Sequence, residues 1–161
     1  MTIKLNSLKY LDNYFSTLTK HIKKNQSNDK IVKLSKLISN IKKKNKKILV
    51  FGNGGSAAIV NHFTVDITKM YKVKCINLNE SSIITCFSND FGFDNWIKEA
   101  INYYADKDDL VILVSSSGMS MNMVNGGKKA IQQKCKLVTF SGFNKNNKLR
   151  KLGNINIWVE S

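Results

Sequence analysis

Residues 48–66 read ILVFGNGGSAAIVNHFTVD, and this stretch decides the fold. The apolar run 48–51 has no polar alternation, which is typical of a strand buried on both faces. Gly52, Gly54 and Gly55 follow within four residues, although the chain holds only 9 glycines. Beyond them the apolar residues recur at helical spacing as far as about Met70. A strand, a glycine turn and a helix in this order form the building unit of a parallel α/β sheet.

The rest of the chain repeats this alternation. We expect strands at 72–78, 109–118, 135–142 and 155–160, because these runs are rich in β-branched and aliphatic residues. The helical patterns between them are 81–88, 93–105, 122–134 and a short turn at 147–153. The sequence therefore predicts a parallel sheet of about five strands with helices on both faces.

Two helices precede this core. Apolar residues at spacings of three and four form a stripe on a helix over 4–24: Leu5, Leu8, Leu11, Phe15, Leu18 and Ile22. A second helix runs over about 31–41. We therefore expect one domain over 1–161, with a helical pair at 1–46 and an α/β core at 47–161. Because the core already has helices for both faces, we expect the stripe to join copies of the chain into a tetramer, or otherwise a dimer, through residues 4–42.

The net charge of +15 raises the question of a nucleic-acid partner. Among the 26 basic residues only Arg150 is an arginine, whereas nucleic-acid readers favour the arginine fork. We therefore expect solvated lysine faces, with nucleic-acid binding by the lysine-rich helices of residues 1–48 as the less favoured alternative. No apolar run approaches the roughly 18 residues that span a bilayer, and the N-terminus lacks a secretion signal, so we expect no membrane contact and a cytoplasmic protein. Cys75, Cys86 and Cys135 all lie in apolar stretches and are expected to be reduced and buried.

Two turns at expected strand ends carry residues suited to anions. GNGGS at 52–56 and SSSGMS at 115–120 each lead into a helix. Unpartnered N–H groups and the helix dipole favour an anion there, and the four serines add hydroxyl groups. Ser115, Ser116, Ser117 and Ser120 thus indicate a phosphate site, with a plain serine-rich helix cap as the alternative. Neither turn is a nucleotide-binding motif of the Walker or GxGxxG kind.

Three motifs together resemble a known family. The segments GNGGSAA with NHF, SNDFGF at 88–93 and SSSGMSMN at 115–122 look like the sugar isomerase (SIS) domain of phosphoheptose isomerases. The resemblance implies a three-layer αβα fold of flavodoxin-like type. It also implies an aldose–ketose isomerase that acts on sedoheptulose 7-phosphate or a related sugar phosphate, for lipopolysaccharide or capsule synthesis.

The resemblance also assigns residues. The sugar contacts would be Asn53, Gly54, Gly55 and Ser56 of the first turn, with Asn89 and Asp90 of the second motif. The phosphate would lie on the serines of the third motif, where Met119 replaces a common Asn.

His62 and Asp66 stand where many family members have His and Glu that bind zinc, with the Glu as proton-transfer base. A spacing of four places both on one helix face. Asp66 is thus the candidate catalytic base and, with His62, an incomplete metal site; an ordinary helix face is the alternative. Zinc is expected only if further ligands come from other residues or another subunit.

The chain ends at WVES, where the family continues into a helix that carries a Gln and a His. This departure, together with Asp66 in place of Glu, keeps a second interpretation open. In that interpretation the chain is a non-catalytic SIS module that binds a phosphosugar or serves as a protein adaptor.

Overall fold

The computed structural model describes the backbone of residues 2–24 and 28–160, and the side chains within 6–23 and 29–160. Five parallel strands form one sheet in the order β2-β1-β3-β4-β5. They span Ile48–Gly52 (β1), Cys75–Asn77 (β2), Leu110–Ser115 (β3), Lys136–Ser141 (β4) and Ile155–Trp158 (β5). The expected three-layer fold with about five parallel strands is confirmed, and strand 72–78 is shorter than expected.

The helices are those expected, with small shifts of their ends. They span Thr2–Lys24 (α1), Asn28–Lys43 (α2), Gly55–Tyr71 (α3), Ser81–Phe91 (α4), Trp96–Tyr104 (α5) and Met121–Gln132 (α6), with a 3₁₀ turn at Leu149–Lys151 (η1). None of the helices in the described part of the chain combines the length and apolar content needed to cross a bilayer.

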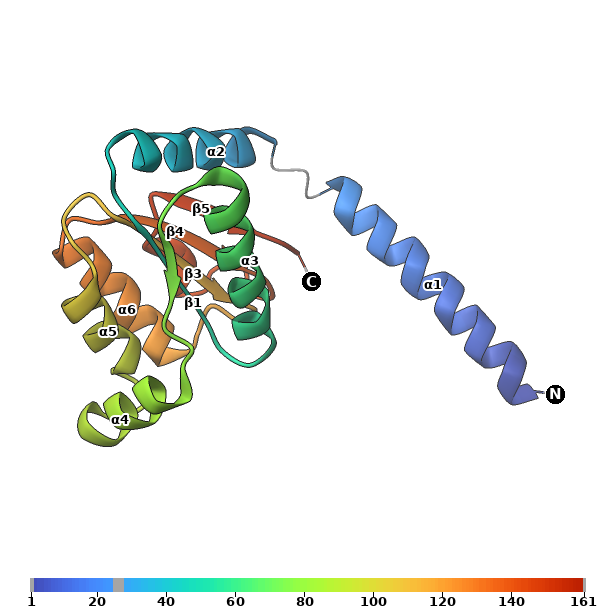
Figure 1. Ribbon diagram of the computed structural model, residues 1–161. Helices are drawn as coiled ribbons and strands as arrows, with labels where there is room; N and C mark the ends of the chain where they lie inside the picture. Colours follow the sequence, from blue (N-terminus) through green and yellow to red (C-terminus); the bar gives the residue numbers. More distant parts are fainter. Residues whose placement is uncertain (1, 25–27, 161) are drawn as a thin grey trace.

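Alternate residues of the central strands enter two separate cores. Leu49, Phe51, Val111, Leu113 and Leu137 pack with α5 and α6 on one face. Ile48, Val50, Leu110, Ile112 and Val138 pack with α2 and α3 on the other. Figure 1 shows these helix pairs on opposite sides of the sheet. Both faces are therefore covered without α1.

Helix α1 extends away from the α/β core in Figure 1. The described part of its apolar stripe is exposed to solvent: Leu8, Leu11, Phe15, Leu18 and Ile22. The side chain of Leu5, which the predicted stripe includes, lies outside the described residues.

One expectation about the cysteines was wrong. Cys75 and Cys135 are buried, and burial raises the pKa of each thiol to about 11. Cys86, however, is exposed on α4. Helix α4 lies at the end of the α/β core and buries none of its residues fully, so an apolar stretch there does not become core.

The parallel register places all strand ends at one edge. Gly52 pairs with Val114, and Ser115 pairs with Ser141. The turns after β1, β3 and β4 therefore lie side by side, at the edge where parallel α/β sheets bind their ligands.

Candidate functional site

The turn after β1, residues 52–56, is called the glycine turn here. A Cβ on Gly52 would meet the backbone carbonyl carbon and oxygen of Ser56 at 2.5 Å, so only glycine lets β1 and the start of α3 approach this closely. Gly54 precedes α3 with φ of +52° and ψ of −122°, a conformation that residues with a side chain rarely adopt. Gly55 has neither constraint, since a Cβ there would meet nothing within 4 Å. The first two glycines thus shape the turn, and the third leaves space open.

The turn after β3, residues 115–120, is called the serine turn. The Ser115 hydroxyl accepts a 3.2 Å hydrogen bond from the Gly118 N–H, and the Ser117 hydroxyl accepts one of 3.2 Å from the Met119 N–H. The Gly142 N–H donates to the Ser116 carbonyl at 2.8 Å, which ties the turn to the end of β4. The hydroxyl groups of Ser115 and Ser117 act as acceptors in their hydrogen bonds, so each keeps its own hydrogen to donate to a ligand.

The first turn of α6 offers further donors. Ser120 precedes the helix, and its side chain makes no capping hydrogen bond. Within the described residues, the backbone N–H groups of Met121 and Asn122 have no acceptor. Unpartnered N–H groups at a helix N-terminus bind anions, and the helix dipole adds to the attraction. The serine turn and the start of α6 therefore form a donor-rich surface suited to a phosphate group.

A hollow of about 280 Å³ opens at the strand edge between these turns. We call it the strand-end hollow. Its polar lining comes from Ser56, Ser115, Ser116 and Ser141, and its apolar wall from Ile59, Val114, Phe140, Phe143 and Val159. The structure thus brings together Ser56, Ser115 and Ser116 from two different turns. Asn53, Gly54, Gly55, Ser117 and Ser120 belong to the same two turns but do not line this hollow.

Asn53 is held by a residue that the sequence did not single out. Its Nδ2 donates to Asn122 Oδ1 at 3.1 Å, and Asn122 Nδ2 donates back to Asn53 Oδ1 at 3.0 Å. Asn122 is only 1% exposed. It ends the quoted segment SSSGMSMN, but a polar residue inside a helix gives no sequence signal of a partner 69 positions away. The pair joins the glycine turn to the start of α6.

Asn89 and Asp90 lie in the last turn of α4, which follows β2 at the same edge of the sheet. Both are exposed, and Asn89 Nδ2 donates to Asp90 Oδ1 at 3.0 Å. The Cys86 thiol donates to the other carboxylate oxygen of Asp90 at 3.7 Å. Neither residue lines the strand-end hollow, so the structure places them near this edge without bringing them onto the serine turn.

Helix α4 is capped by Glu80, which the sequence analysis also missed. Its carboxylate accepts hydrogen bonds from Ser82 N at 3.0 Å and Ile83 N at 3.3 Å, as well as from the Ser82 hydroxyl. These bonds, above all the one from the Ser82 side chain, lower the pKa of Glu80. Glu80 therefore stays ionised and fixes the start of the helix that carries Asn89 and Asp90.

His62 and Asp66 face solvent on α3, with His62 Nε2 3.6 Å from Asp66 Oδ2. Asp66 lines a separate groove of about 400 Å³ between α2 and α3, with neighbours such as Leu34, Phe63 and Met70. Within the described residues no three His, Cys, Asp or Glu side chains gather as metal ligands. Zinc prefers four ligands, so this pair on its own does not fit a zinc ion without donors from elsewhere.

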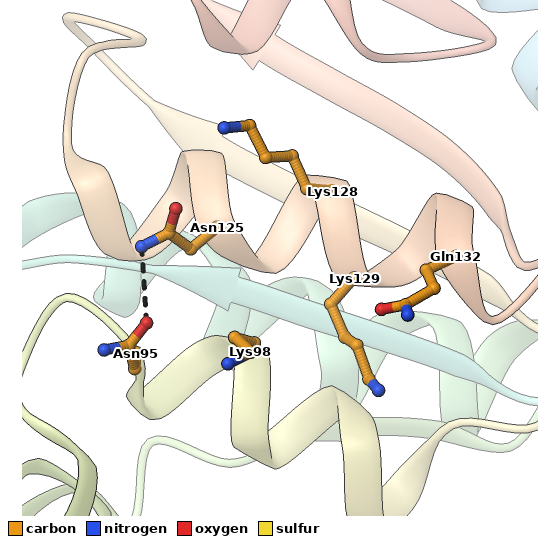
Figure 2. A pocket seen from close by; sticks show the side chains of 6 residues that line it. All are labelled: Asn95, Lys98, Asn125, Lys128, Lys129 and Gln132. Carbon is orange, nitrogen blue, oxygen red and sulfur yellow. Dashed lines mark hydrogen bonds between the residues drawn. The ribbon is translucent and has the colours of Figure 1, made fainter.

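A basic hollow of about 270 Å³ lies between α5 and α6, on the outer helix layer. Figure 2 shows its lining of Asn95, Lys98, Asn125, Lys128, Lys129 and Gln132. Asn125 Nδ2 donates to Asn95 Oδ1 at 3.4 Å across it. None of these residues was a predicted site residue, and none of them lines the strand-end hollow.

Comparison with known proteins agrees with this geometry. Residues 9–142 match the SIS domain family. A phosphoheptose isomerase of Aliarcobacter butzleri is 36% identical over 135 residues, which cover 80% of this chain and 71% of that protein. The chain belongs to the SIS domain family of the phosphoheptose isomerases. A second family member, from Buchnera aphidicola, is 32% identical over 136 residues, covering 81% of this chain and 70% of its own.

Solved SIS structures share the fold. A phosphoheptose isomerase from Francisella tularensis superposes with a TM-score of 0.88 at 24% identity, over 96% of this chain and 86% of the other. One from Neisseria gonorrhoeae gives a TM-score of 0.85 at 22% identity, over 95% and 84% of the two chains. At these identities the match establishes the architecture, and the residues of the site rest on this chain's own geometry.

Proposed function

We propose that this protein is a phosphosugar isomerase that interconverts sedoheptulose 7-phosphate, or a closely related ketose phosphate, with the corresponding aldose phosphate. Family membership supports the reaction class, since the relatives described above are phosphoheptose isomerases. The donor-rich surface formed by the serine turn and the start of α6 supports the phosphate. This surface is the observation that carries the proposal.

The substrate would be held from its phosphate end. The hydroxyls of Ser115, Ser116, Ser117 and Ser120, with the unpartnered N–H groups of α6, would bind the phosphate oxygens. The sugar would then extend along the glycine turn past Asn53, Gly54, Gly55 and Ser56. Asn89 and Asp90 of α4, at the same edge of the sheet, would approach its hydroxyl groups.

The chemistry requires a proton to move between two adjacent carbons. A base removes a proton from the carbon next to the ketose carbonyl while the carbonyl oxygen gains a proton, which gives a cis-enediol. The base then returns the proton to the former carbonyl carbon as the hydroxyl on the other carbon loses its proton and becomes the aldose carbonyl. Asp66 is the candidate base. It is half exposed on α3, which begins in the glycine turn, but the rise of an α-helix puts Asp66 about 16 Å along the axis from Gly55, too far to reach a sugar on the glycine turn of the same chain.

One observation favours a second function. Asp66 lines the α2–α3 groove and not the strand-end hollow. A SIS module that binds a phosphosugar without converting it, or that serves as an adaptor for another protein, would need the serine turn but no base. Binding without turnover distinguishes this module from the enzyme.

We also propose that the chain works as a cytoplasmic homo-oligomer, a tetramer or otherwise a dimer, and that its leading helices and α/β core form one SIS domain. The exposed stripe of α1 supports the oligomer, because a row of five large apolar side chains in water is unfavourable. Helix α2 supports the single domain, because Leu34 and Ile41 are buried in the same core as β1 and β3. No nucleic-acid or membrane partner is proposed.

Calorimetric titration with sedoheptulose 7-phosphate tests the phosphate site. Ser117→Ala combined with Ser120→Ala should weaken binding by about 1–3 kcal/mol, the usual contribution of hydrogen bonds to a charged group. Ser16→Ala, on the exposed surface of α1, is the matched control and should bind like the unmodified protein. Equal affinity of the double variant and the control would overturn the phosphate assignment.

A further inference from the structure

We infer that Asn122 is a positioning residue, which fixes the orientation of the Asn53 amide and holds the glycine turn at a set distance from the start of α6. The inference rests on the proposed phosphosugar site, because it joins the turn assigned to the sugar with the turn assigned to the phosphate. Asn122 itself is buried and reaches the ligand only through other groups.

The orientation of the Asn122 amide follows from its neighbour. The Met123 N–H donates to Asn122 Oδ1 at 2.9 Å. A backbone N–H is a donor only, so the atom that faces it must be the amide oxygen. The other amide atom of Asn122 is therefore Nδ2, which donates to Asn53 Oδ1 at 3.0 Å.

The orientation of the Asn122 amide also determines the orientation of the Asn53 amide. Since Asn53 Oδ1 accepts from Asn122, its Nδ2 donates to Asn122 Oδ1 at 3.1 Å. A flipped Asn53 would bring two oxygens and two NH₂ groups face to face and lose both bonds. One N–H and one lone pair of the Asn53 amide remain uncommitted, and Asn53 is half-buried, not enclosed. The pair thus presents a defined donor and a defined acceptor to the sugar.

The same pair sets a spacing. Asn53 follows Gly52, the last residue of β1, and Asn122 is the second residue of α6, whose free N–H groups would bind the phosphate. The two hydrogen bonds between the side-chain amides hold these segments together, so a sugar phosphate contacts both segments at a fixed separation. A free phosphate uses only the α6 side and does not depend on that separation.

Calorimetry with two ligands tests this role. Asn122→Ala should weaken the binding of sedoheptulose 7-phosphate by about 10-fold, the scale of one or two lost hydrogen bonds. It should leave the affinity for inorganic phosphate within about 2-fold of that of the unmodified protein. Asn53→Ala should weaken the sugar phosphate similarly, and adding Asn122→Ala to it should weaken binding little further, because Asn122 acts through Asn53. Asn125→Ala, one turn further along α6, is the control and should change neither affinity. Parallel loss of both ligands, or full additivity of the two substitutions, would overturn the inference.

Hydrogen exchange on the ligand-free protein separates this inference from the proposed function. Asn122→Ala should speed amide hydrogen exchange in peptides covering 52–58, which are distant in sequence from the substituted residue. Asn125→Ala should leave this exchange unchanged. If the unmodified protein fails to bind sedoheptulose 7-phosphate, the proposed function fails, yet the exchange result still supports or contradicts the positioning role. Unchanged exchange in 52–58 would contradict it.

Discussion

Gly118 and Asn147 are in direct contact at the base of the serine turn. Gly118 has φ of +62°, and a Cβ built on it would collide with the Asn147 side chain. Asn147 is 1% exposed and is held by hydrogen bonds to Ser141 Oγ at 3.0 Å and to the Asn144 carbonyl at 2.9 Å. The loop after β4 therefore packs against the serine turn at Gly118 and supports it there.

Gly118→Ala should lower the free energy of unfolding by about 2–4 kcal/mol, because it adds both left-handed backbone strain and a clash with Asn147. Urea denaturation measures this loss. Gly55→Ala is the matched control, since a Cβ there meets nothing within 4 Å, and it should stay within about 0.5 kcal/mol. Equal stability of the two variants would show that the contact is not as described.

At the amino-terminal ends of the strands, Lys47 lies between two carboxylates. Its Nζ is 2.5 Å from Asp106 Oδ2 and 2.6 Å from the buried Asp109 Oδ2. Partial burial lowers the pKa of Lys47, but the hydrogen bonds and charges of the two aspartates outweigh it, and the pKa lies above the ordinary 10.5. A raised pKa in the folded state stabilises the protein below the unfolded pKa, and this contribution is lost as pH rises through the folded value.

The stability difference between the unmodified protein and Lys47→Gln should therefore be constant from neutral pH up to pH 10.5, where both aspartates are ionised, and shrink above it. Urea titrations across this range give the difference curve. Lys44→Gln, at an exposed position where the lysine side chain has no ion-pair or hydrogen-bond partner among the described residues, should show no such decline. A difference that grows above pH 10.5 would contradict the sign of the Lys47 interaction.

Thiol labelling distinguishes the three cysteines. Cys86 is exposed, whereas Cys75 and Cys135 are buried with pKa values of about 11. Because the thiolate is the reactive form, one thiol should react rapidly at pH 8 in the folded protein and all three after unfolding. Cys86→Ser should abolish the fast reaction. Persistence of fast labelling in that variant would mean that a second cysteine is accessible.

The stripe on α1 should mediate assembly. Leu8→Glu with Phe15→Glu places carboxylates in the apolar contact and should dissociate the oligomer to a particle of about 18 kDa, the mass of one chain. Asn6→Glu with Asn13→Glu adds the same charge at exposed polar positions of α1 and should leave the assembly intact. Light scattering at micromolar concentration measures both. An unmodified protein of 18 kDa would reject the proposed oligomer.

The sequence predicted the order of strands and helices and the parallel sheet well, for identifiable reasons. The apolar run before Gly52 and the glycines after it leave little choice but a buried strand that turns sharply into a helix. Parallel topology then carries Ser56 and Ser115 to the same edge. Local pattern was enough because each of these features depends on neighbours in sequence.

Other features depend on tertiary contacts and were missed. Asn122 looks like an ordinary helix residue until Asn53 is placed beside it. Cys86 lies in an apolar run, but α4 projects to the end of the core and leaves it exposed. The groove around Asp66 depends on how α2 packs on α3, which the spacing of His62 and Asp66 does not reveal.

Conversion of sedoheptulose 7-phosphate by the purified protein, followed by NMR, tests the phosphosugar isomerase most directly. We expect the ketose signals to decline and aldose phosphate signals to appear, with a much slower reaction in the Ser117→Ala and Ser120→Ala double variant and an ordinary rate in Ser16→Ala. An unchanged ketose spectrum, at concentrations where calorimetry shows the sugar phosphate bound, would contradict the isomerase and leave the binding module.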